Sequence, residues 1–153
     1  MTAPQKGKAT VTTPVEREIH IERIFNAPRE RVWAALTEPE LLLGWFPTHA
    51  AEVDLRERGR MRFAWETDAD EAVIDELAPP ERFVFRWRPE GSERPYTTVT
   101  ILLRDVGDGT TELTLTETGF AKLPDPHASF RGNEDGWAKE LEELTAFLEG
   151  RAA

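Results

Sequence analysis

The sequence predicts an α+β fold: a curved antiparallel sheet of about seven strands wrapped around a long C-terminal helix, with two short helices after the first strand. Segments that alternate between apolar and polar residues recur through residues 15–119, separated by turn residues. The strongest helical periodicity closes the chain, at residues 133–149. A hairpin-connected antiparallel sheet buries one face, and this last helix is the only element long enough to cover it.

The first strand is expected at residues 15–25, where Ile19, Ile21 and Phe25 share one parity. Arg23 lies on the same parity, so it either sits near the end of the strand or reaches a buried partner.

Two short helices are expected within residues 26–46. Pro28 and Pro39 each suit a first helical turn, where a missing N–H costs nothing. Asn26 and Thr37 are expected to cap them. The apolar faces comprise Val32, Trp33 and Leu36 in the first helix, and Leu41, Leu42 and Trp45 in the second.

Six further strands should follow, joined mostly by hairpins. They are expected at residues 51–55, 61–65, 72–77, 83–88, 96–106 and 110–119. Residues 58–60 and 107–109 contain glycine and are expected to form tight turns. Pro79 and Pro80 should end the strand that precedes them.

The final helix is expected to begin near Asn133 and to end at Gly150. Its apolar stripe consists of Trp137, Leu141, Leu144 and Leu148, spaced by four, three and four residues, with Phe147 widening it. Residues 120–132, which contain two prolines, are expected to form an irregular loop.

Several motifs in this order resemble the START-like (SRPBCC) superfamily, in the branch related to the C-terminal domain of the activator of the large heat-shock chaperone's ATPase. The resemblance covers residues 16–149. It is carried by Ala27-Pro28, Val32-Trp33, Thr37-Glu38-Pro39-Glu40, Trp45, Asp108-Gly109-Thr110 and Gly136-Trp137. It implies the helix-grip architecture, in which a curved sheet grips a C-terminal helix.

Length and composition restrict the function. The chain has 153 residues, which suits a single domain, expected at residues 15–150 with tails at 1–14 and 151–153. The first tail lacks the apolar centre of a secretory signal peptide. A net charge of −10 argues against nucleic acid or an anionic membrane surface as a partner. No apolar run approaches the roughly 18 residues of a spanning helix. The absence of cysteine excludes disulfides and thiolate metal sites, and fits a cytoplasmic protein.

No dedicated catalytic or metal-binding motif is found. His20, His49 and His127 are scattered without metal-ligand spacing, and no cofactor or metal is expected. His127, in the loop before the last helix, is the best catalytic candidate among them, although such histidines are more often simply exposed.

Glu117 is the most informative carboxylate because it lies in line with Leu113 and Leu115, and either Asp75 or Glu76 should also point inward. An inward carboxylate could act as a general acid or base. The more common explanation is a salt bridge to Arg23 or a position at a strand end facing water. The alternating arginines of residues 56–62 and 82–88 are interpreted as a solvated face with cross-strand ion pairs, rather than as an anion site.

Aromatic residues suggest a ligand cavity. A curved sheet gripping one helix does not always fill its interior, and START-like relatives commonly bind hydrophobic ligands in the space left. The residues expected to line this cavity are Trp45, Phe46, Phe63, Trp65, Phe83, Phe85, Val99, Ile101, Leu113, Leu115, Glu117, Trp137, Leu141 and Leu144. Its opening is expected between residues 46–50 and residues 120–132.

These observations support binding of a hydrophobic or amphipathic small molecule, lipids included, in a cavity between the sheet and the C-terminal helix. The resemblance also implies two alternatives: a chaperone-interacting module like the ATPase activators, and an enzyme of the cyclase or dehydratase kind that uses an inward carboxylate. The sequence assigns no catalytic residue, so catalysis ranks below binding. Ligand identity and oligomeric state stay open, a homodimer included.

Overall fold

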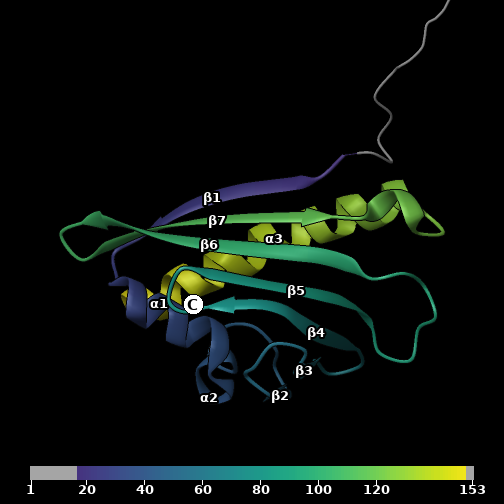
Figure 1. Ribbon diagram of the computed structural model, residues 1–153, viewed down its shortest axis with the longest axis horizontal. Coiled ribbons are helices and arrows are strands. Elements are labelled where there is room, and N and C mark those ends of the chain that lie inside the picture. Colours follow the sequence, from purple (N-terminus) through teal and green to yellow (C-terminus); the bar gives the residue numbers. More distant parts are fainter. Residues whose placement is uncertain (1–16, 151–153) are drawn as a thin grey trace, which may run out of the picture.

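The computed structural model describes residues 17–150 (Figure 1). The expected tails at residues 1–14 and 151–153, and residues 15 and 16 of the expected first strand, lie outside the described residues.

A single seven-stranded antiparallel sheet forms the body of the domain. The strands are β1 (Ile19–Phe25), β2 (Ala50–Val53), β3 (Arg60–Ala64), β4 (Ala69–Ala78), β5 (Arg82–Pro89), β6 (Thr97–Gly107) and β7 (Thr110–Thr118). Their order in the sheet is β1-β7-β6-β5-β4-β3-β2, so every pairing is a hairpin except that of β1 with β7. The predicted α+β fold is confirmed.

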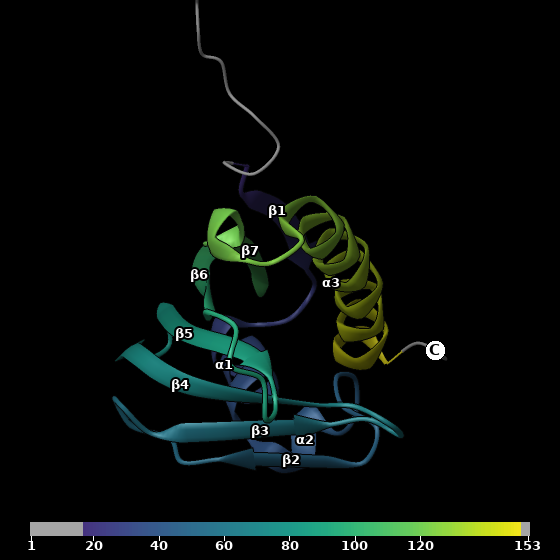
Figure 2. The same ribbon diagram turned by 90° about the vertical axis from the view of Figure 1, so that its right-hand side faces the viewer.

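The sheet curves around the last helix, α3 (Pro126–Glu149). Figure 2 shows α3 across the open side of the curve, with β1 and β7 at one end of the sheet and β2 and β3 at the other. The two short helices, α1 (Arg29–Thr37) and α2 (Pro39–Leu42), connect β1 to β2. This arrangement is the helix-grip architecture that the sequence predicted.

The stripe predicted on the last helix forms the contact with the sheet. Trp137, Leu141, Leu144 and Leu148 are all buried, and Leu144 is 0% exposed. They belong to one apolar core with residues of the inner face of the sheet, such as Ile19 and Leu115. Burying this stripe removes apolar surface from water, which is the main force that holds the helix on the sheet.

The last helix begins earlier than predicted, and the expected loop at residues 120–132 is wrong. Residues 120–122 form a short 3₁₀ helix, η2 (Phe120–Lys122), and α3 starts at Pro126. The side chain of Asp125 caps it by accepting a hydrogen bond from the backbone N–H of Ala128 at 3.3 Å. A proline at the first helical position is favourable, so it marks a helix start here and not a loop.

The caps predicted for the short helices are also wrong. The residues at the two N-caps are Pro28 and Glu38, and neither provides a side-chain cap. Thr37 is instead the last residue of α1, and its hydroxyl donates to the carbonyl of Trp33 at 2.8 Å. The backbone N–H of Asn26 donates to the Glu149 carboxylate, which joins this connection to the end of α3.

The turn between β2 and β3 requires a glycine. Arg58 has a φ of 66°, and a Cβ on Gly59 would lie 2.0 Å from the carbonyl oxygen of Asp54. Only glycine fits this close approach between β2 and β3. In β4, a register shift between Ile74 and Glu76 changes the phase of the strand, so Asp75 and Glu76 both pair with arginines of β5. The expectation that one of these two carboxylates points inward is therefore wrong.

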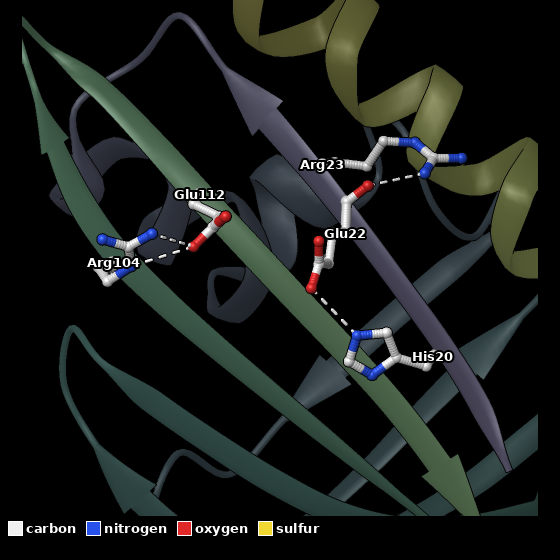
Figure 3. A network of polar contacts seen from close by, with 5 residues as sticks. All are labelled: His20, Glu22, Arg23, Arg104 and Glu112. Atoms are coloured by element: carbon white, nitrogen blue, oxygen red, sulfur yellow. Dashed lines mark hydrogen bonds and ion pairs between the residues drawn. The ribbon is translucent and has the colours of Figure 1, made fainter.

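The outer face of the sheet is charged and solvated. Figure 3 shows the ion pair of Arg104 with Glu112 on neighbouring strands, and His20 beside Glu22 on β1. Arg23 donates to the backbone carbonyl of Glu22 and not to a buried carboxylate. The expected cross-strand pairs are confirmed for β5, whose arginines pair with acidic residues of β4 as Arg82–Glu76, Arg86–Asp75 and Arg88–Glu71. On β3, Arg62 pairs with Glu52 of β2 at 3.6 Å and with Glu90, which follows β5, at 2.6 Å.

Replacing Leu144 by alanine should destabilise the domain by about 2–5 kcal/mol, because it leaves a cavity between α3 and the sheet. The midpoint of urea unfolding measures this loss. Leu102→Ala is the matched control: Leu102 is 40% exposed on β6, and its truncation should change stability by no more than about 0.5 kcal/mol. Equal midpoints for the two variants would contradict the packing of α3 described here.

Candidate functional site

A buried carboxylate lies where α3 meets the centre of the sheet. Alternation along β7 turns Leu113, Leu115 and Glu117 inward, and Glu117 is 0% exposed. The predicted inward direction of this side chain is therefore confirmed. Neither of the two common explanations for an inward carboxylate applies here. Glu117 does not pair with Arg23, and it does not face water at a strand end.

Four donors from three other elements converge on the Glu117 carboxylate. Its Oε2 accepts hydrogen bonds from Trp87 Nε1 at 2.8 Å, Thr97 Oγ1 at 2.5 Å and Asn133 Nδ2 at 3.0 Å. Its Oε1 accepts from Trp137 Nε1 at 2.9 Å. We call these five residues the Glu117 network. The hydrogen bonds of this network offset the cost of removing the carboxylate from water, and all four donors are uncharged.

The Glu117 network orients two tryptophans. Trp87 comes from β5 and Trp137 from α3, and both indole N–H groups point to the same carboxylate. Their ring centroids lie 5.2 Å apart in a stacked arrangement. Phe46 stacks on Trp137 at 5.7 Å and meets the ring of Trp65 edge-on at 5.3 Å. Side chains from α3, β5 and the segments around α2 and β3 thus form one aromatic cluster.

This cluster lines a pocket of about 140 Å³ beside the first half of α3. We call it the aromatic pocket. Its lining consists of Phe46, Trp65, Asp70, Trp87, Gly132, Asn133, Gly136, Trp137 and Glu140. Phe46 and Trp137 are buried and form the base, whereas the two glycines are exposed at the rim. An apolar cavity of about 150 Å³ holds one benzene molecule, so this pocket has the size of one small ring or a compact aliphatic group.

Two carboxylates at the pocket have perturbed acidity. Burial raises the pKa of the Asp70 carboxyl from 3.8 to about 6; Arg94 opposes this rise, and Asp68 and Glu117 add to it. Burial also raises the pKa of the Glu140 carboxyl from 4.5 to about 7, opposed by Lys139 and reinforced by Glu143. Within residues 17–150, neither Asp70 nor Glu140 forms a salt bridge or a side-chain hydrogen bond.

The structure brings together part of the predicted cavity lining. Phe46, Trp65 and Trp137 line the aromatic pocket, and Glu117 lies behind it. Phe63 and Phe85 contact this cluster from the sheet. The ring centroid of Phe63 lies 5.2 Å from that of Phe46, and the ring centroid of Phe85 lies 5.6 Å from that of Trp87. Trp45 stacks on Phe46 but points its indole N–H to the carbonyl of Ala35. The others are packed in the core: Phe83, Val99, Ile101, Leu113, Leu115, Leu141 and Leu144.

Sequence reasoning did not find the residues that make the pocket polar. Glu140 falls outside the predicted apolar stripe of the last helix, and Asn133 marks only its predicted start. Asp70 precedes the strand predicted at residues 72–77, whereas β4 begins earlier and includes it. The sequence offers one signal for this site. Trp87 has the same parity as Phe83 and Phe85, which indicates that its side chain lies on the inner face of the sheet. The rim also differs from the predicted opening, since residues 133–140 of α3 contribute more of it than residues 120–132.

The histidines do not contribute to this site. His20, His49 and His127 are exposed, and His127 lies in the first turn of α3, not in a loop. Within the part of the chain that the structure describes, no group of three or more histidine, cysteine or acidic side chains could hold a metal ion.

Residues 26–149 match the family model described as Activator of Hsp90 ATPase homolog 1-like protein. The chain belongs to this family. The match includes the Glu117 network and the whole aromatic pocket, and it confirms the resemblance seen in the sequence. No curated protein matches the sequence.

Solved structures share the fold of this chain. CalU16 from Micromonospora echinospora is 29% identical, with 90% of this chain and 81% of that chain covered and a TM-score of 0.68. MLL2253 from Mesorhizobium loti is 22% identical, with 90% of this chain and 100% of that chain covered and a TM-score of 0.77. PFC0360w, an HSP90 activator from Plasmodium falciparum, is 22% identical, with 86% of this chain and 96% of that chain covered and a TM-score of 0.74. The last two show a shared fold.

None of the helices within residues 17–150 is long and apolar enough to cross a membrane.

Replacing Glu117 by glutamine should destabilise the domain by about 1–3 kcal/mol. An amide offers one acceptor oxygen and a donor –NH₂, so at least one of the four donors of the Glu117 network would face another donor. Urea unfolding measures the loss. Glu112→Gln on the same strand removes only the exposed pair with Arg104 and should cost less than about 1 kcal/mol. Equal losses would show that the network contributes nothing beyond a surface pair.

Domain stability should decrease as the pH rises from 5 to 8. The native state holds protons on Asp70 and Glu140 up to pKa values of about 6 and 7, whereas the unfolded chain releases them near 3.8 and 4.5. The folded state therefore binds more protons in this window, and deprotonation favours unfolding. Asp70→Asn with Glu140→Gln should flatten the dependence, as measured by urea midpoints at several pH values. Glu142→Gln, on the exposed side of α3, should leave it unchanged.

Proposed function

We propose that this domain binds a small amphipathic molecule in the aromatic pocket between the sheet and α3. The observation that carries the proposal is the Glu117 network, which orients Trp87 and Trp137 beside a pocket of about 140 Å³. Small-molecule sites are typically concave and largely apolar, with a few convergent polar groups. The lining has this composition: four aromatic side chains, one amide and two carboxylates.

Preorganisation strengthens this proposal. Each of the two indoles is held by a hydrogen bond to a side chain that is itself fully buried, so little rotamer freedom remains to be lost on binding. A pure stability role would need no opening, whereas Gly132 and Gly136 leave the rim accessible. The absence of cysteine supports a cytoplasmic setting for this binding.

Filling the pocket should abolish binding. Gly136 lines the pocket, and a Cβ there would have no neighbour within 4 Å, so we expect Gly136→Leu to cover the pocket without displacing the residues around it. The change also favours the helix by roughly 1 kcal/mol, so the variant should fold. We expect benzyl alcohol, a neutral one-ring probe, to shift the indole ¹H–¹⁵N resonances of Trp87 and Trp137 in the parent and not in this variant.

Two controls make this result specific. Glu134→Leu adds the same side chain to an exposed position of α3 outside the pocket lining, and it should bind benzyl alcohol like the parent. The indole of Trp33, which packs on Phe83, should not shift in any variant. Shifts that persist in Gly136→Leu, or that spread equally to Trp33, would refute binding in the aromatic pocket.

A chaperone-interacting module is a second candidate, favoured by the match to a family named after an activator of the Hsp90 ATPase. Gly136→Leu separates the two candidates. A partner that docks on the outer surface should bind the parent and this variant equally, whereas a small-molecule function should be lost in the variant.

Catalysis is a third candidate, and Asp70 and Glu140 are the observation that favours it. Carboxyl groups with pKa values of about 6 and 7 beside a pocket are suited to proton transfer near neutral pH. They replace Glu117 as candidates, because both oxygens of Glu117 already accept hydrogen bonds from the protein.

A further inference from the structure

We infer that the aromatic pocket selects organic cations: its ligand carries an alkylammonium group that lies against the aromatic side chains between Asp70 and Glu140. This inference deepens the proposed function and rests on it. It names the chemical class of the ligand from the charges and rings that line the pocket.

The aromatic lining provides the first argument. Phe46, Trp65, Trp87 and Trp137 converge within centroid distances of 5.2–6.1 Å, and three of the four are tryptophan. Tryptophan is the aromatic side chain that attracts cations most strongly, and the attraction grows when the cation is desolvated. Two of these indoles donate to the Glu117 carboxylate, and a hydrogen bond to such an acceptor polarises the donor toward greater ring electron density. The rings are therefore well suited to a positive group.

The carboxylates provide the second, independent argument. Asp70 and Glu140 line the pocket from β4 and α3, and among residues 17–150 neither has a salt-bridge partner. The other carboxylates of the inner site and of the sheet do have partners, such as Glu117 in its network and Glu71 with Arg88 at 2.9 Å. A ligand cation would supply the counter-charge that the protein does not provide for Asp70 and Glu140.

The basic residues nearby do not fill this role. Arg94 lowers the pKa of Asp70 without forming a salt bridge with it. The two residues line an adjoining groove together, and Arg94 is not among the residues that line the aromatic pocket. Lys139 is exposed and precedes Glu140 on α3 without lining the pocket. No arginine, lysine or histidine is among the residues that line the aromatic pocket. An anionic ligand would meet Asp70 and Glu140 with no basic residue in the pocket lining, and the net charge of −10 would repel it from a distance.

Choline and its neutral isostere 3,3-dimethylbutan-1-ol test this inference, because they share shape and differ in charge. Isothermal titration at pH 8, where both carboxyl groups are deprotonated, should show choline binding at least about tenfold more tightly, a difference of about 1.4 kcal/mol. The anionic analogue 3,3-dimethylbutanoate should bind more weakly than either.

Charge removal identifies the groups responsible. Asp70→Asn and Glu140→Gln keep the shape of the pocket, and each should weaken choline binding by about fivefold, the upper range for one exposed ion pair. The double variant should bring the affinity for choline close to that for the neutral isostere, with only the preference that the rings provide remaining. Glu142→Gln, which removes one exposed charge from the same helix, should bind choline like the parent.

The outcomes separate this inference from the proposed function. Equal affinity for choline and the alcohol, both lost in Gly136→Leu, would overturn cation selection and leave small-molecule binding standing. An affinity for choline that is unchanged in the double charge variant would also overturn it. If neither probe binds and benzyl alcohol fails as well, the proposed function and this inference fall together.

Discussion

A buried carboxylate at the junction of helix and sheet constrains this domain more than any other group. Glu117 is fully buried, and its hydrogen bonds reach β5, β6 and α3 from β7. Burial of such a group without partners would cost several kcal/mol, so all four elements must keep their places for the fold to be stable. Apolar packing along Leu141 and Leu144 holds α3 on the sheet, but it is not directional. The hydrogen bonds of Glu117 add the direction, since they allow only one rotation and one height of the helix.

The same constraint produces the candidate site. To reach Glu117, Trp87 and Trp137 must turn their indole N–H groups inward, and their rings then line a pocket with Phe46 and Trp65. The helix carries Gly132 and Gly136 at this point, so nothing on α3 fills the space above the rings. Asp70 and Glu140 are left partly buried beside this apolar surface, and burial raises the pKa of both carboxyl groups. Family membership in the Activator of Hsp90 ATPase homolog 1-like group agrees with the fold, while the chemistry of the pocket comes from these side chains.

Local patterns in the sequence predicted well wherever one residue's environment follows from its neighbours in the chain. Alternation located all seven strands, and the spacing of Trp137, Leu141, Leu144 and Leu148 identified the covering stripe. Predictions were wrong where a residue is compatible with two different local structures. Pro126 is compatible with a loop and with a first helical turn, and the capping of its helix by Asp125 decides for the helix. The bulge in β4 likewise follows from pairing with β5, which no single strand reveals.

The sequence by itself determined the fold class, the inward direction of Glu117 and the abundance of aromatic core residues, because periodicity assigns each side chain to a face. Only the tertiary structure decided what Glu117 contacts. Its partners Trp87, Thr97 and Asn133 are 30, 20 and 16 residues away, and contacts across such separations depend on sheet order and helix placement. For the same reason Glu140 resembled a solvent-facing residue of α3 in the sequence. It lines a pocket because Trp65 and Asp70, some 70 residues earlier, lie opposite it in the folded chain.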